Sequence, residues 1–326
     1  MKRRAVAGLM LALMACSSPQ LADAPMADQW VAAPLEVERI ELGVAQVGRL
    51  RFRGGVALSS DAPMFGGFSG LEVLDDGRLI AVTDNADWLE ARLVLNDAGD
   101  LIGVTGARMA FMRDETATPF ESKVAGDAEG LTQLADGRFA VAFEQTQSIR
   151  IYDLNRDGPF GAAEPGPVLE GASRLRDNSG LEAIASDGNG ALLVGAEGGG
   201  GPSPLWLAPA DADAPVQAIA RYRPARGFSL TSLDRLPEGG FVALERFYAP
   251  IIGARARILV LPQTLSGEAR GALLGELAPP LPLDNFEGIA AVRMGETTRL
   301  YILSDDNFEA RQRTLLYAFD IVEDAD

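Results

Sequence analysis

A motif that recurs five times at nearly even spacing constrains the fold of this chain more than any other feature. Most copies begin with a polar and a small residue, continue through two apolar segments separated by a glycine-containing turn, and end on an acid. The copies start at residues 69, 129, 182, 229 and 287, so that each new copy begins 47 to 60 residues after the last. A repeat of this length, made of strand-type segments without helical periodicity, predicts the four-stranded blades of a β-propeller.

The second copy shows how the strands of one blade are arranged along the chain. We expect an innermost strand at 131–134, a hairpin turn at 136–137, and further strands at 138–144, 148–154 and, on the edge, 167–170. The last copy lacks an outer partner strand, which the segments 35–42 and 49–58 can supply. The sequence therefore predicts an all-β protein, a five-bladed β-propeller whose ring is closed by N-terminal strands, or a six-bladed one if those strands form their own blade.

The N-terminus has the pattern of a bacterial lipoprotein leader. Three basic residues at 2–4 precede an apolar run at 5–15 that is too short to span a membrane, and Cys16 follows as the only cysteine. The residues at 13–16 resemble a lipobox, in which the cysteine is lipidated and becomes the mature N-terminus. We therefore expect a signal peptide at 1–15, a lipidated Cys16 with a flexible tether at 16–35, and the propeller domain at 36–326.

The residue after the cysteine predicts where the mature protein resides. Ser17 stands where a lipoprotein retained at the inner membrane would carry aspartate, so we expect the periplasmic face of the outer membrane. Without lipidation of Cys16 the protein would be periplasmic or secreted. We expect a monomer that contacts the membrane only through the lipid anchor.

Composition excludes several classes of function. The chain contains no histidine, so it cannot form a Ser-His-Asp triad, a Cys-His pair or a histidine-ligated zinc site. Its formal net charge of −17 opposes binding to nucleic acid. Any catalysis must therefore use carboxylates, Lys or Arg, hydroxyls, or a metal ion held by oxygen ligands.

Acidic residues recur at both ends of the repeat. Glu129, Glu182 and Glu287 precede equivalent inner strands, and the adjacent strands end at Asp84, Glu144, Glu197, Glu245 and Asp305. Because antiparallel pairing brings those ends together, we expect the acids to line one mouth of the central channel. Oxygen ligands favour Ca²⁺ or Mg²⁺. We predict a Ca²⁺ site at Glu129, Glu182 and Glu287 with Asp84 or Asp305 nearby; alternatively, the acids only cap turns.

The remaining polar groups near these positions suggest catalytic roles. An acid that does not bind metal, Glu144 or Glu197, could act as a general base. Arg246 or Arg313 could stabilise negative charge that develops on the substrate. We expect a small ester or phosphoester as the substrate.

The motifs as a set resemble a known bacterial family, the phytase-like proteins described as having the esterase-like activity of phytase. The matching stretches are FGGFSGL at 65–71, AVTDN at 81–85, DAEGL at 127–131, NSGLE at 178–182, LER at 244–246, NFEGI at 285–289 and SDDN at 304–307. The resemblance covers about residues 47–322 and implies a secreted or periplasmic propeller with phosphatase or esterase activity. The acidic mouth is also similar to that of calcium propellers such as β-propeller phytase and the gluconolactonase and paraoxonase lactonases.

Two functions remain open from the sequence. The first is a calcium-dependent hydrolase of phosphoesters or carboxylic esters; phytate itself is a poor match because the chain has only two lysines, Lys2 and Lys123. The second is a non-catalytic, envelope-tethered propeller that binds a ligand or a protein partner, with calcium at most structural.

Overall fold

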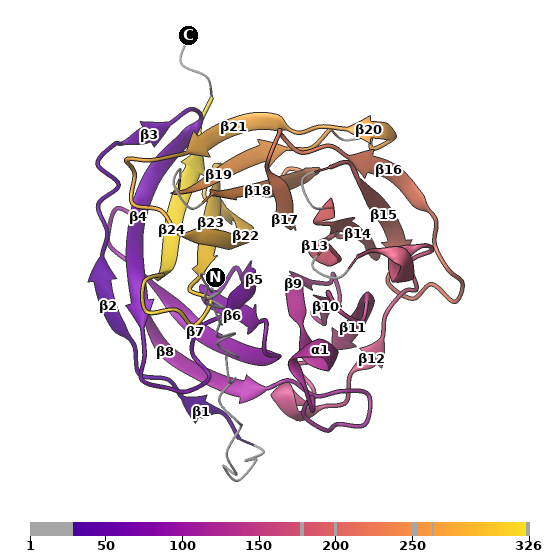
Figure 1. Ribbon diagram of the computed structural model, residues 1–326. Helices are drawn as coiled ribbons and strands as arrows, with labels where there is room; N and C mark the ends of the chain where they lie inside the picture. Colours follow the sequence, from indigo (N-terminus) through magenta and orange to yellow (C-terminus); the bar gives the residue numbers. More distant parts are fainter. Residues whose placement is uncertain (1–28, 177–178, 199–200, 250–252, 263, 324–326) are drawn as a thin grey trace, which may run out of the picture.

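The five predicted repeats form five blades around a common centre (Figure 1). The structure, a computed structural model, describes residues 29–176, 179–198, 201–249, 253–262 and 264–323. The predicted signal peptide, Cys16 and most of the tether lie outside these residues. Across the described ranges, no helix has the length and apolar character needed to cross a membrane.

The first three blades follow the order of the chain from the centre outward. Blade 1 contains β5 (Phe68–Val73), β6 (Arg78–Thr83), β7 (Asp87–Leu95), β8 (Leu101–Phe111) and, at its edge, β1 (Val31–Ala32). Blade 2 contains β9 (Ala128–Gln133), β10 (Phe139–Phe143), β11 (Ser148–Tyr152) and β12 (Glu164–Pro165). Blade 3 contains β13 (Leu181–Ser186), β14 (Ala191–Ala196), β15 (Ser203–Pro209), β16 (Ala218–Tyr222) and a parallel edge strand, β20 (Gly267–Ala269).

The last two blades complete the ring. Blade 4 contains β17 (Ser229–Arg235), β18 (Phe241–Ala249), β19 (Gly253–Val260) and β21 (Ala272–Leu277). Blade 5 contains β22 (Asn285–Met294), β23 (Thr297–Asp305), β24 (Thr314–Ile321), β4 (Leu50–Ser59), β2 (Glu36–Arg39) and β3 (Gln46–Val47). The described helices are short: α1 (Lys123–Gly126), η1 (Gly158–Phe160) and η2 (Ala172–Arg174).

Blade 5 is built from both ends of the chain. β4 pairs with the C-terminal strand β24, with Val56 opposite Leu316, and β2 pairs with the other side of β4. The predicted closure by N-terminal strands is therefore confirmed, and those strands join the fifth blade instead of forming a sixth. This pairing covers a sheet edge that would otherwise expose unpaired backbone groups.

Two boundaries differ from the sequence prediction. The edge strand of blade 2 is β12 and not 167–170; Pro167 lacks the N–H that continued pairing would need, and Leu169 makes only a single bridge to Val216. At the N-terminus, pairing begins at Val31 on β8, inside the predicted tether. The fully buried Ala33 continues this contact by donating its N–H to the carbonyl of Ala107, at 2.9 Å.

The glycine of the repeat is explained by the close approach of neighbouring inner strands. A Cβ placed on Gly130 would lie 2.4 Å from the carbonyl oxygen of Glu182 in blade 3, and one on Gly70 would lie 2.8 Å from Leu131 in blade 2. The blades further pack through large buried rings: Trp88 of blade 1 contacts Tyr152 of blade 2 edge-on at 5.3 Å. Trp88 is thus a core residue and does not line the mouth.

Candidate functional site

A β-bulge at the same place in all five inner strands positions the site. Pairing between the first two strands of each blade skips one inner-strand residue; in blade 2 it passes from Ala128 opposite Phe143 to Gly130 opposite Ala142. The skipped residues are Ser69, Glu129, Glu182, Thr231 and Glu287. Because a bulge redirects a side chain, this irregularity turns equivalent residues toward the channel. The three glutamates therefore lie within the inner strands and not before them.

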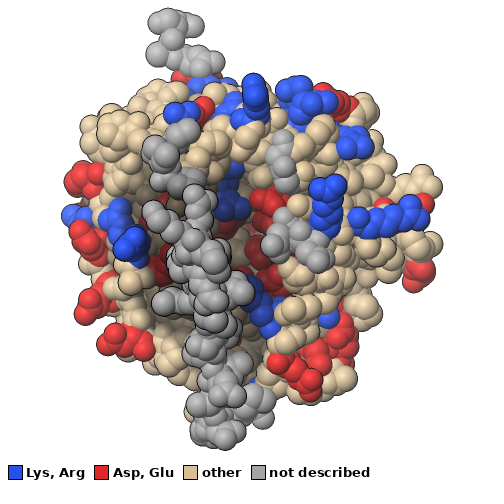
Figure 2. All heavy atoms as spheres, viewed as in Figure 1, with Lys and Arg blue, Asp and Glu red and all other residues tan. Residues whose placement is uncertain are grey.

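Four of the five bulged residues, all but Thr231, and residues at or just after the ends of the second strands line one cavity of about 460 Å³. Acidic side chains are visible in the centre of this face in Figure 2. The lining residues are Ser69, Asp84, Glu129, Glu144, Glu182, Glu197, Arg246, Asn285, Glu287, Asp305 and Asn307. Eight of the ten side chains predicted from the sequence are thus brought together, Glu245 and Arg313 being the exceptions, while their individual roles remain predictions.

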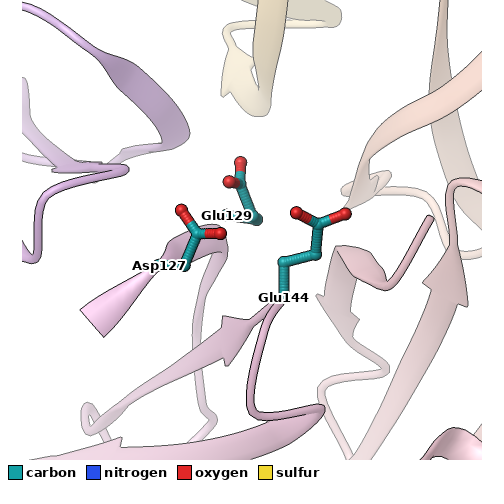
Figure 3. Close-up of side chains that lie close together, drawn as sticks. All are labelled: Asp127, Glu129 and Glu144. Carbon is teal, nitrogen blue, oxygen red and sulfur yellow. The ribbon is translucent and has the colours of Figure 1, made fainter. Parts of the chain in front are cut away.

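Three carboxylates of blade 2 form the tightest group in the cavity region. Asp127, Glu129 and Glu144 each offer one oxygen, and these oxygens all lie within 4.8 Å of one another (Figure 3). Asp127 was not predicted as a site residue. It lies just before β9 in the DAEGL stretch at 127–131, and its place in that motif beside Glu129 could have indicated it.

A lysine outside the predicted set reaches this group from α1. Lys123 forms ion pairs with Asp84 of blade 1 and with Asp127, whose Oδ1 lies 3.3 Å from the ammonium nitrogen. The hydroxyl of Ser122 caps the helix by accepting a hydrogen bond from the N–H of Ala125. The local sequence could indicate the pair with Asp127, four residues on, but not the pair with Asp84, which lies 39 residues away in the preceding blade.

The opposite part of the cavity is organised by a guanidinium. Arg246 of blade 4 donates to the amide oxygen of Asn285 at 2.8 Å and pairs with Glu287 at 3.2 Å and Glu197 at 3.4 Å. Asn285 in turn donates from its amide nitrogen to Glu287, at 2.8 Å. On one side of the cavity, the carboxylates thus have Lys123 as their cationic partner. On the other side, Glu197 and Glu287 share Arg246.

Burial and crowding raise the pKa values of most of these acids. Burial raises the pKa of Glu287 to about 7 and that of Asp305 to about 8. Burial, followed by repulsion from neighbouring carboxylates, raises the pKa values of Glu129 and Glu182 well above their ordinary value. Burial also raises the pKa of Glu144. Such a group of acids must hold protons or gain a cation.

Two predicted groups lie elsewhere. Glu245 lies inside β18 and does not end that strand, contrary to the prediction. It is 1% exposed and does not line the cavity; its carboxylate accepts a hydrogen bond from the Tyr222 hydroxyl and pairs with Arg257. Arg313 lines a second cavity of about 450 Å³ beside β2, and its backbone N–H donates to Asp284. Arg313, in the loop after β23, is absent from the lining of the central cavity, and its role in stabilising substrate charge stays a prediction.

One known protein family matches most of the length of the chain. The model of the phytase-like family, described as the esterase-like activity of phytase, matches residues 63–308. The chain belongs to this family. The matched range includes every residue that lines the cavity. A comparison with curated proteins found no match.

One solved structure, with a TM-score above 0.5, supports the fold, and two others are similar at lower scores. The catalytic domain of a GH62 α-L-arabinofuranosidase from Coprinopsis cinerea superimposes with a TM-score of 0.52 at 10% identity, covering 86% of this chain and 100% of that one. A candidate gluconolactonase gives a TM-score of 0.48 at 13% identity, with 91% and 96% of the two chains covered. An aldose sugar dehydrogenase from Streptomyces coelicolor gives 0.43 at 12% identity, with 88% and 99% covered. At these identities the likeness concerns the fold alone.

Proposed function

We propose that this phytase-like protein is a Ca²⁺-dependent hydrolase of phosphoesters or carboxylic esters whose active site is the acid-lined cavity. The observation that carries the proposal is the grouping of Asp127, Glu129 and Glu144 within 4.8 Å, in the same cavity region as Arg246. The family description, which names an esterase-like activity, supports the reaction class.

The residues present suit a hard divalent cation. All three grouped side chains offer carboxylate oxygens, and further acids of the cavity surround them. Ca²⁺ accepts six to eight oxygen ligands in flexible geometry, whereas Mg²⁺ requires a near-ideal octahedron. Asp127, Glu129 and Glu144 would hold the ion, and Asp84 and Glu182 would complete its surroundings. When bound, such a cation polarises a phosphoryl or carbonyl oxygen.

The other side of the cavity would handle the substrate. Arg246 would bind the anionic group of the substrate and stabilise negative charge that develops during the reaction. Glu197 and Asn285 would hold the guanidinium of Arg246 in place. Glu287 would accept the proton of the attacking water, since burial brings its pKa to about 7, where a general base is most effective. A bound cation nearby would lower the pKa of Glu287 from this raised value and favour its ionised form.

The expected location follows from the leader and is part of the same proposal. A lipid on Cys16 would hold the propeller at the periplasmic face of the outer membrane, with residues up to about 30 as the tether. The cavity would then be open to small esters in that compartment.

The experiment combines calcium titration with a substrate panel. Calorimetry with Ca²⁺ and Mg²⁺ should give micromolar calcium binding, and aryl phosphates and aryl esters of graded size should be hydrolysed only when calcium is present. The triple variant Asp127→Asn, Glu129→Gln, Glu144→Gln should lose both. The control Asp136→Asn changes a hairpin-turn acid that accepts the N–H of Arg138 and should change neither.

Other outcomes would contradict the proposal in distinct ways. Absence of binding at millimolar calcium, together with unchanged hydrolysis in a chelator, would exclude a cation-dependent site. Calcium binding without turnover on the whole panel would instead favour the non-catalytic binding protein.

A further inference from the structure

The chain uses lysine so rarely that the place of its lysines is informative. Of 29 basic residues, 27 are arginines, and Lys123 is the only lysine among the residues that the structure describes. Arginine is a rigid planar donor, whereas lysine carries a compact charge on a flexible stem with three rotatable donors. A lysine ammonium therefore resembles a monovalent cation more closely than a guanidinium does.

The position of this ammonium overlaps with the proposed cation site. Lys123 pairs with Asp84 of blade 1 and Asp127 of blade 2, so it joins acids from two blades. Asp127 is also a member of the group with Glu129 and Glu144. The same carboxylate cannot give its full charge to both the ammonium and a divalent ion. The two cations must therefore compete for Asp127.

The surroundings of Lys123 allow it to leave. Its side chain is 54% exposed, whereas that of Asp127 is 4% exposed and that of Asp84 is 21% exposed. The two carboxylates are thus largely buried, Asp84 in the lining of the cavity and Asp127 beside it, while the lysine side chain reaches them from solvent. Ion pairs with one exposed partner are weak and are screened by salt, so displacement by a divalent ion requires little free energy. The second Asp84 oxygen, Oδ1, is buried without a hydrogen-bond partner in the described part of the chain.

We propose that Lys123 is a tethered counter-ion that occupies Asp84 and Asp127 until a divalent cation displaces it, and that it thereby sets the calcium affinity of the cavity. This inference rests on the proposed function for the identity of the competing cation. It assigns Lys123 a role in binding regulation, since the ammonium contacts the ligands and not the reacting groups.

The test measures calcium affinity and metal-free stability in Lys123→Met. Removing one unit charge at ion-pair distance should tighten calcium binding by roughly tenfold at 0.1 M salt, measured by calorimetry. Without calcium, the variant should melt at a lower temperature than wild type at pH 8, and saturating calcium should remove the difference. Lys123→Arg should restore the wild-type stability without calcium and leave calcium binding no tighter than in wild type.

A matched control separates local competition from net charge. Arg138→Met changes the net charge by the same amount, but Arg138 pairs with Asp136 and Glu164 in blade 2, away from the cavity lining. It should change calcium affinity less than twofold, because exposed charges more than a Debye length apart are screened.

The proposal is overturned if Lys123→Met binds calcium as wild type does or more weakly. Failure of the proposed function gives a different pattern. If wild type binds no calcium but Lys123→Met does, Lys123 is a competitor strong enough to close the site. If neither binds, both proposals are wrong. If both bind with a tenfold difference and no hydrolysis occurs, the competition is supported and only the reaction is excluded.

Discussion

Blades 2 and 4 each carry a glutamate near the mouth-side end of the repeat, but one register position apart: Glu245 lies opposite Leu230, the place that Phe143 has opposite Ala128, and Glu144 follows one residue later. The two side chains have opposite surroundings. Glu144 of blade 2 lines the cavity near Asp127 and Glu129. Glu245 of blade 4 is fully enclosed, accepting a hydrogen bond from Tyr222 at 2.7 Å and pairing with Arg257 at 2.8 Å. One blade therefore contributes negative charge to the cavity, whereas the other neutralises it inside the protein.

The difference teaches that strand register decides which side chain reaches the cavity, because Arg246 pairs with Ser229 at the place where Glu144 meets Asp127. In blade 4 the bulged position is Thr231, and its hydroxyl donates to the carbonyl of Leu244 instead of facing a ligand. The residue after Glu245, Arg246, enters the cavity in place of an acid. Blade 4 thus supplies the only guanidinium among the cavity-lining residues of the described chain, opposite the carboxylates of blade 2.

The largest effect should follow removal of this guanidinium. Arg246→Met should lower kcat/KM by about 10²–10³-fold, the usual loss when one group that stabilises transition-state charge is removed. Calcium affinity should not weaken, because the variant removes a positive charge from an acidic cavity. Steady-state kinetics at saturating calcium, with calorimetry alongside, would measure both. Retained activity would show that blade 4 has no part in the reaction.

A chemically identical change in the two blades should have opposite effects on stability. Glu245→Gln leaves the charge of Arg257 with only its longer contact to Glu276, at 3.6 Å, and should lower the free energy of unfolding by roughly 3 kcal/mol. Glu129→Gln removes a carboxylate that is buried among others and should raise the metal-free melting temperature at pH 8. Denaturant titration of both variants would test this. Two changes of the same sign would mean that the surroundings of the two acids do not differ as described.

The pH dependence of metal-free stability should be the smallest effect, and its sign follows from the raised pKa values. An acid whose pKa is higher in the folded state binds protons more tightly there, so its contribution to stability is lost as pH rises through the folded pKa. With Glu287 at about 7 and Asp305 at about 8, the melting temperature should fall by a few degrees between pH 5 and pH 8.5.

Calcium provides the control for this pH effect. Because the ion neutralises the same carboxylates, a saturating concentration should flatten the decline, and Glu129→Gln should reduce it even without calcium. A melting temperature that rises over this pH range would show that ionisation of these acids does not destabilise the folded protein.

The fold could be predicted largely from local signals. The spacing of the repeat indicated five blades, and the unpartnered last repeat indicated that N-terminal strands close the ring. The bulged glutamates were identified because the same residue type recurs at the same place. The edge strand of blade 2 was misplaced, because an edge strand is held by few contacts and leaves a weak pattern.

The site could be predicted only in part, because its details depend on partners that are distant in sequence. Nothing near Glu245 indicates that Arg257, on the next strand, will neutralise it. Lys123 reaches Asp84 through a four-residue helix whose position depends on the packing of two blades. Arg313 shows the converse: it follows a predicted acid closely, yet the loop after β23 directs it to another cavity.

The closure of blade 5 has a consequence for when the protein acquires its site during synthesis. Every strand of blades 1 to 4 has been made once residue 277 is complete, but β24 ends only at Ile321. Until β24 meets β4, Glu287 and Asp305 have no finished blade to hold them in the cavity. A nascent or truncated chain would thus carry most of the acids without the ring that concentrates them. Cation binding would then report that the two ends of the chain have met.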